Sequence, residues 1–110
     1  MSLSSHVLDV TRGIPAADIP VTLFLLVGDQ RVELAQSHTD ADGRIAAPFG
    51  GELLKGYYEL LFSVLHYFKQ SETPSFYEEI PIRFRIDDPQ RHYHVPLLLS
   101  PWSYSSYRGS

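Results

Sequence analysis

A pair of histidines near the end of the chain is the first pattern in this sequence that suits chemistry. His92 and His94 stand two positions apart, and on a β-strand such side chains lie on the same face, about 7 Å from each other. Imidazole exchanges protons near neutral pH and also binds metal ions. The spacing therefore fits an acid/base site, a metal site or two solvated histidines, and the pattern alone does not choose among them.

Three further features could contribute to the same site. His6 could act as a base at a strand end, or complete a three-histidine zinc site with the pair. Arg44 directly follows a tight turn, where a guanidinium can hold a carbonyl or an anionic ring. Residues 100–110 are rich in hydroxyl and aromatic side chains, so this tail is either disordered or docked against a ligand site. Taken one at a time, His6 and Arg44 also fit the simpler description of exposed residues.

Short apolar or alternating segments, separated by Gly, Pro and Asp, must position these residues. This punctuation is typical of an all-β protein. Seven or eight strands predict an antiparallel β-sandwich, and one short helix is expected around residues 67–71, before Pro74. The expected strands cover residues 6–10, 21–27, 31–36, 44–47, 57–68, 77–86 and 91–100, with a last extended piece at 103–107.

Alternation along the later strands predicts which side chains face the core. Every second residue from Ile80 to Ile86 is apolar, and so is every second residue from Tyr93 to Leu99. His92 and His94 therefore point away from the core. Pro96 lacks an N–H for the ladder, which predicts an edge strand or a bulge nearby.

Composition limits the classes of protein to which the chain can belong. Its 110 residues suit a single domain, 1–110, and 44% hydrophobic with 20% charged residues is ordinary globular usage. A net charge of −4 with scattered basic residues argues against nucleic acid as a partner. The lack of cysteine allows a reducing compartment. With no signal-like start and no long apolar run, we expect a soluble, cytoplasmic protein without a membrane partner.

Two segments, residues 21–27 and 97–99, are apolar on both faces. A sandwich with one solvated face does not need this pattern, so we expect the chain to associate with copies of itself.

Three groups of motifs resemble the transthyretin-related family and, within it, the 5-hydroxyisourate hydrolases. They are His-Val-Leu-Asp at 6–9 with Gly-Ile-Pro-Ala at 13–16, then Thr39 with Asp-Gly-Arg at 42–44, and the run 92–101 with Tyr-Arg-Gly-Ser at 107–110. The resemblance covers essentially the whole chain. The Tyr-Arg-Gly-Ser ending is its most specific element, because the hormone-carrying transthyretins lack that ending and the histidine at position 6.

The resemblance implies a seven- or eight-stranded sandwich with one short helix, assembled as a homotetramer with active sites at subunit interfaces. It also implies cofactor-free hydrolysis of a small purine-derived cyclic amide, without a metal. Carried over by motif, the catalytic residues are His6, Arg44, His94 and Tyr107, and the substrate-binding residues are these same four with His92 and Ser110. The alternatives are a transthyretin-like carrier of an aromatic ligand and a zinc hydrolase that uses the three histidines.

Overall fold

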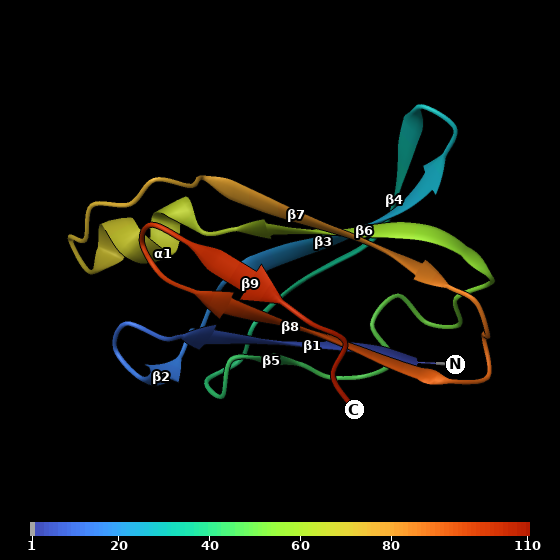
Figure 1. The fold of residues 1–110 in the computed structure, drawn as a ribbon, viewed down its shortest axis with the longest axis horizontal. Coiled ribbons are helices and arrows are strands. Elements are labelled where there is room, and N and C mark those ends of the chain that lie inside the picture. Colours follow the sequence, from blue (N-terminus) through green and yellow to red (C-terminus); the bar gives the residue numbers. More distant parts are fainter. Residues whose placement is uncertain (1) are drawn as a thin grey trace.

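The computed structural model describes residues 2–110 as two β-sheets packed face to face, with one short helix (Figure 1). One sheet has the strand order β2-β1-β8-β9, with β5 also paired to β1, and the other has the order β4-β3-β6-β7. This arrangement confirms the predicted all-β sandwich. The elements are β1 (Ser2–Asp9), β2 (Ile14–Pro15), β3 (Pro20–Val27), β4 (Gln30–His38), β5 (Arg44–Ile45), β6 (Gly56–Ser63), α1 (Leu65–Gln70), β7 (Glu79–Ile86), β8 (His92–Leu99) and β9 (Tyr104–Ser106).

The core lies between the two sheets and is built from alternate residues of each long strand. Leu3 and Val7 of β1 are fully buried, and so are Leu23 of β3 and Leu60 of β6. Burial of such a side chain stabilises the fold by about 1.5–3 kcal/mol. On β7 and β8 the apolar positions that the alternation predicts are buried or half-buried, including Tyr93, Val95, Leu97 and Leu99, so this expectation is confirmed. Pro96 and Leu98, on the opposite face of β8, are also buried and half-buried.

The expected strand over 57–68 is too long. β6 ends at Ser63, and α1 begins at Leu65. Val64 and Phe68 are both buried, and their spacing of four residues fits one face of a helix as well as it fits an apolar strand. The sequence also gave no sign of β2, a two-residue strand in a segment that reads as a turn.

β1 and β8 pair in parallel, whereas every other strand pair among residues 2–110 is antiparallel. The first and last long strands of the chain therefore lie side by side in the middle of one sheet (Figure 1). The register places Ser4 opposite His94 and His6 opposite Pro96. On the other side of β1, Arg44 of β5 pairs with His6.

Pro96 is not on an edge strand, because β8 lies between β1 and β9. The irregularity that proline predicts lies on the β9 side of β8 instead. The ladder there runs to the pair Leu97 and Ser106 and resumes only as a bridge between His94 and Gly109. A proline nitrogen is tolerated at such an interruption because it has no hydrogen to donate.

No helix among the described residues is long and apolar enough to cross a membrane.

Candidate active site

The outer face of the β1/β8 pair carries most of the residues that the sequence singles out. Along β1 the odd-numbered residues from 3 to 9 are buried and the even-numbered ones are half-buried, so His6 points outward. Along β8, His92 is exposed and His94 is half-buried on the same face. Paired residues of neighbouring strands project to the same side of a sheet, so Arg44 of β5 joins them there.

His94 is the most enclosed member of this cluster. Its Nδ1 lies 2.7 Å from Ser4 Oγ, and its backbone oxygen accepts a hydrogen bond from Gly109 N at 2.8 Å. Burial lowers the pKa of His94, and the nearby positive charges of Arg44, His6 and His92 lower this pKa further, while a hydrogen bond with Ser4 acts in the opposite direction. His94 is therefore neutral at pH 7, in the form that accepts a proton.

His6 is held by the turn that precedes β5. Its Nε2 lies 3.0 Å from the carbonyl oxygen of Asp42. A carbonyl can only accept, so this nitrogen carries the hydrogen, and in neutral His6 the lone pair is on Nδ1. The turn packs on β1 through Gly43, whose oxygen accepts from Val7 N at 2.7 Å. A Cβ on Gly43 would lie 2.5 Å from the backbone oxygen of Val7, and its φ of +75° also favours glycine.

Arg44 presents a free cation to this face. Its backbone N–H donates to Asp40 Oδ1 at 2.9 Å, which fixes the end of the turn. Its side chain is exposed, and within residues 2–110 the guanidinium forms no ion pair. It is thus available to an anionic or carbonyl ligand.

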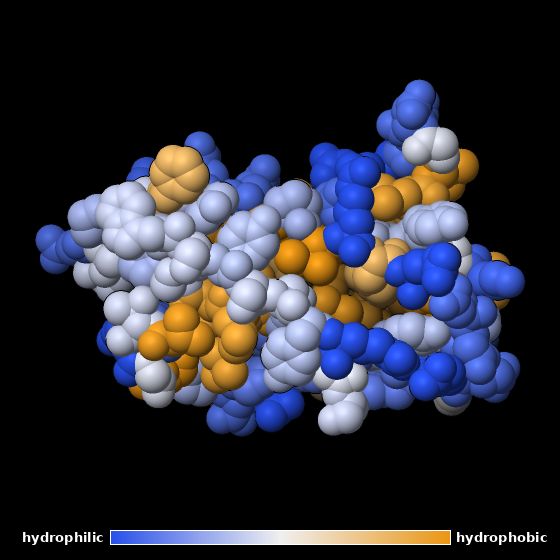
Figure 2. Space-filling model, viewed as in Figure 1, coloured by the Kyte–Doolittle hydropathy of each residue, from blue (hydrophilic) through white to orange (hydrophobic). Residues whose placement is uncertain are grey.

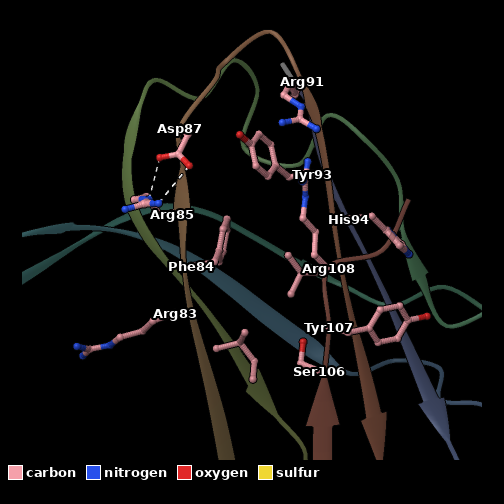
Figure 3. A pocket seen from close by; sticks show the side chains of 12 residues that line it. Arg83, Phe84, Arg85, Asp87, Arg91, Tyr93, His94, Ser106, Tyr107 and Arg108 are labelled. Carbon is pink, nitrogen blue, oxygen red and sulfur yellow. Dashed lines mark hydrogen bonds and ion pairs between the residues drawn. The ribbon is translucent and has the colours of Figure 1, made fainter.

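The C-terminal segment is docked on β8, so it is ordered rather than disordered. β9 pairs with β8, and Gly109 bridges to His94. Tyr107 lies between these two anchors with 58% of its surface exposed, and its hydroxyl has no hydrogen-bond partner in the described chain. Figure 3 shows the rings of His94 and Tyr107 extending away from the arginines of β7 and toward the blue strand, β1. Ser110 follows the bridge and is exposed.

A separate hollow of about 370 Å³ lies between β7 and the segment formed by β8 and the C-terminus (Figure 3). Ile82 and Phe84 give it an apolar floor, and Figure 2 shows apolar surface between strongly polar side chains in this region. Four arginines also line it: Arg83, Arg85, Arg91 and Arg108. His94 and Tyr107 belong to its lining, but His6 and Arg44 do not. The hollow and the histidine cluster are therefore neighbouring features rather than one cavity.

The structure thus places His6, Arg44, His92 and His94 on one face of the sheet. Tyr107 lies in the C-terminal segment, close to the bridge between Gly109 and His94. Sequence reasoning missed Ser4, whose contact with His94 depends on the β1/β8 register, and the direct approach of Gly109. The Tyr-Arg-Gly-Ser motif contained the only sign of Gly109, without indicating what it touches. Among residues 2–110, no group of three or more His, Asp or Glu side chains is arranged to hold a metal ion.

A two-sheet sandwich with a neutral, half-buried histidine beside an arginine and two further histidines is a small all-β protein equipped for acid/base chemistry. The sequence model described as the HIUase/Transthyretin family matches residues 3–109. The chain belongs to this family.

Similar proteins include a 5-hydroxyisourate hydrolase, an allantoin synthase and a thyroxine-bound transthyretin. The 5-hydroxyisourate hydrolase of Deinococcus radiodurans is 46% identical, over 98% of this chain and 95% of that protein. A crystal structure of (S)-allantoin synthase is 41% identical with a TM-score of 0.89; the match covers 99% of this chain and 43% of that chain, less than half of it. Sea bream transthyretin in complex with thyroxine is 28% identical with a TM-score of 0.91, over 99% of this chain and 95% of that one.

Proposed function

We propose that this chain hydrolyses the cyclic amide of 5-hydroxyisourate to 2-oxo-4-hydroxy-4-carboxy-5-ureidoimidazoline, a step in the degradation of urate to allantoin. The observation that carries the proposal is the grouping of His6, Arg44 and His94 on one sheet face, with the pKa of His94 lowered by burial and by its neighbours' positive charge. The identity of 46% with a protein named 5-hydroxyisourate hydrolase supports this choice of substrate.

Hydrolysis of a cyclic amide needs a water made nucleophilic and a partner for the negative charge that develops on the carbonyl oxygen. A neutral imidazole, of His6 or His94, takes a proton from water. Arg44 holds the oxygen as it becomes negative, and the other imidazole protonates the departing nitrogen. Tyr107 orients the ring through its unpartnered hydroxyl, and His92 and Ser110 contribute to binding. The mechanism uses protein side chains and no cofactor.

A carrier of a small aromatic ligand is the second candidate, and the fold shared with sea bream transthyretin favours it. A carrier does not require a proton acceptor, whereas this face holds a half-buried neutral histidine next to a free guanidinium. Tight binding of a thyroid-type ligand without any hydrolysis of 5-hydroxyisourate would favour the carrier. Hydrolysis favours the enzyme.

The deciding experiment follows the loss of freshly generated 5-hydroxyisourate by its absorbance. The wild-type chain should consume it far faster than the buffer does, and His94→Ala should reduce the rate by about 10²- to 10⁴-fold, the usual contribution of one general acid/base group. His66→Ala is the matched control because His66 is exposed on α1. Equal rates for the wild type and His94→Ala would remove His94 from the mechanism.

A zinc mechanism makes a different prediction. If the three histidines hold a catalytic zinc ion, a chelator should abolish hydrolysis and the purified active protein should contain zinc. We expect full activity in the presence of a chelator and no stoichiometric metal.

We also propose that residues 1–110 form one domain, and that four copies assemble with the active sites at subunit interfaces in the cytoplasm. Support comes from apolar side chains left at the surface, such as Val10, Ile14 and Val27, which are 53%, 39% and 55% exposed. Analytical ultracentrifugation should give the mass of four chains. Sedimentation as a monomer at assay concentration, with full activity, would contradict this assembly.

A further inference from the structure

Ser4 lies between two histidines of the proposed site. Its Oγ is 2.7 Å from Nδ1 of His94 and 3.2 Å from Nε2 of His92. The parallel register places Ser4 directly opposite His94. The two imidazoles are stacked, with ring centroids 6.4 Å apart and an interplanar angle of 14°. The hydroxyl thus links a half-buried imidazole to an exposed one.

The number of hydrogens on the Ser4 hydroxyl limits which groups can donate in this link. A serine hydroxyl has one hydrogen to donate. Ser4 can therefore donate to one imidazole only, and the other imidazole must donate its own N–H to Ser4 Oγ. Two arrangements use the serine hydrogen within this link: in one, Nδ1 of His94 carries the hydrogen and Nε2 of His92 accepts from Ser4, and in the other the two imidazoles exchange roles.

The outer end of the chain of hydrogen bonds is compatible with both arrangements. Ser2 Oγ lies 2.6 Å from Nδ1 of His92, and a hydroxyl can donate to that nitrogen or accept from it. The path therefore runs from His94 through Ser4 and His92 to Ser2. Both neutral arrangements satisfy all three of its hydrogen bonds.

We propose that Ser4 is a positioning residue for His94 and that Ser4 and His92 form a proton relay with it. Ser4 holds the Nδ1 side of the ring and leaves Nε2 for the substrate water. This proposal rests on the proposed function, because the relay serves the hydrolytic step.

The proton transfers balance in the step that forms the tetrahedral adduct. As the water oxygen bonds to the carbonyl carbon, Nε2 of His94 takes the proton of the water. Nδ1 of His94 gives its proton to Ser4 Oγ, and the proton of Ser4 moves to Nε2 of His92. The carbonyl electron pair moves to the oxygen that Arg44 holds. The step begins with neutral groups and ends with one negative charge on that oxygen and one positive charge on His92.

The surroundings of His94 give a physical reason for moving the charge. Arg44 of β5, His6 of β1 and His92 of β8 all disfavour a positive charge on its ring. His92 is exposed, so water solvates a positive charge there better than at His94. The relay therefore relieves a repulsion that would otherwise raise the barrier of proton abstraction.

Three serine variants test the positioning role. Ser4→Ala removes the hydroxyl from a half-buried position and should lower kcat by about tenfold or more with little change in KM, since it acts on a general acid/base group. Ser4→Thr keeps a hydroxyl on a β-strand and should restore most of kcat. Ser37→Ala is the matched control, because Ser37 is an exposed strand serine on the other sheet, and its kcat should stay within about twofold of the wild type. An unchanged kcat in Ser4→Ala, or a loss that Ser4→Thr does not restore, would overturn the proposal.

His92→Ala tests the relay separately, and it should lower kcat severalfold. An unchanged kcat in this variant would overturn the relay. Nitrogen-15 NMR of the histidines supplies a readout that needs no substrate: Ser4→Ala should shift the His94 Nδ1 signal, and Ser37→Ala should not. If wild-type protein fails to hydrolyse 5-hydroxyisourate, the proposed function fails, while the NMR comparison still shows whether Ser4 holds His94. An unshifted His94 signal in Ser4→Ala would overturn the positioning role.

Discussion

Gly109 lies directly against the imidazole of His94. A Cβ at position 109 would be 2.5 Å from Cδ2 and 3.2 Å from Cγ of that ring, and Gly109 N donates to His94 O at 2.8 Å. Glycine lets the C-terminal segment approach this closely because it has no side chain. Together with Ser4 at Nδ1, Gly109 confines the ring on two sides.

We therefore expect Gly109→Ala to displace the His94 ring. A misplacement of about 1 Å in a catalytic group can cost about 10²-fold in rate, so kcat/KM should fall by roughly 10- to 100-fold. Steady-state assays and a thermal melt measure the effect on activity and on stability. The control is Gly56→Ala, where a Cβ would make ordinary contacts of 3.7 and 3.8 Å. Equal activity of the two variants would show that the ring does not need the space at Gly109.

Arg44 should set the pH range in which His94 is neutral. Its positive charge is the second-largest cause of the lowered pKa of His94, after burial. Removing that charge in Arg44→Gln makes protonation easier, so the pKa of His94 rises. The acidic limb of the kcat/KM profile should then move to higher pH, and an NMR titration of His94 should move in the same direction. Arg12→Gln, whose charge is not among the causes of this shift, is the control.

The same pKa has a consequence for stability. The folded-state pKa of His94 lies below its ordinary value of about 6.5, so the unfolded chain binds a proton more readily. The contribution of His94 to stability is therefore complete above pH of about 6.5 and is lost as the pH falls through the folded pKa. Urea unfolding of the wild type and His94→Gln at several pH values should show a smaller loss toward acid in the variant.

The sequence predicted the local parts of this structure well, because alternation reports which face of a strand is buried. The exposed and half-buried positions of His92 and His94 followed from Tyr93 and Val95 alone. The parallel pairing of β1 with β8 did not follow, since it joins residues about 90 positions apart and leaves no periodic signal. The contacts of Ser4 depend on that pairing, so no inspection of the serine itself could have found them.

Boundaries were predicted less well where one pattern fits two structures. Residues 57–68 are mostly apolar, and the change from β6 to α1 falls inside this run. The family resemblance suggested six site residues. The strand pairs position His6, Arg44, His92 and His94, and the C-terminal segment along β8 positions Tyr107. The sequence alone could not assign the first proton to His94 rather than His6, because the burial of His94 and the charges around it arise only from the fold.

Tyr107 offers a test of the C-terminal segment that leaves its backbone intact. Tyr107→Phe removes a hydroxyl that has no partner among residues 2–110, so stability should not change. Loss of one hydrogen bond to substrate, about 1–1.5 kcal/mol, should lower kcat/KM by about tenfold. Tyr104→Phe is the matched control, since the Tyr104 ring packs edge-on against Tyr77, which precedes β7. Wild-type kcat/KM in Tyr107→Phe would exclude a contact between this hydroxyl and the substrate.

Variants around a buried carboxylate on the other sheet test stability without changing the proposed catalytic residues. Glu59 of β6 is only 2% exposed, and it accepts from Arg31 Nη1 at 2.7 Å and from Arg83 Nε at 3.0 Å. Replacing both arginines by glutamine would leave this charge buried without a cation.

We expect the double variant Arg31→Gln/Arg83→Gln to lose about 1–3 kcal/mol of unfolding free energy. This is less than the 3–5 kcal/mol typical of a fully buried pair, because the two arginines are 45% and 68% exposed and water can reach the carboxylate after their removal. The control is Arg85→Gln, because Arg85 lies on β7 like Arg83 but pairs with the exposed Asp87. Loss of this exposed pair should cost less than about 1 kcal/mol of unfolding free energy. Urea unfolding measures both, and kcat should stay unchanged since neither pair touches the histidine face. Equal losses of unfolding free energy in the two variants would mean that the ion pairs of buried Glu59 stabilise the fold no more than the exposed pair does.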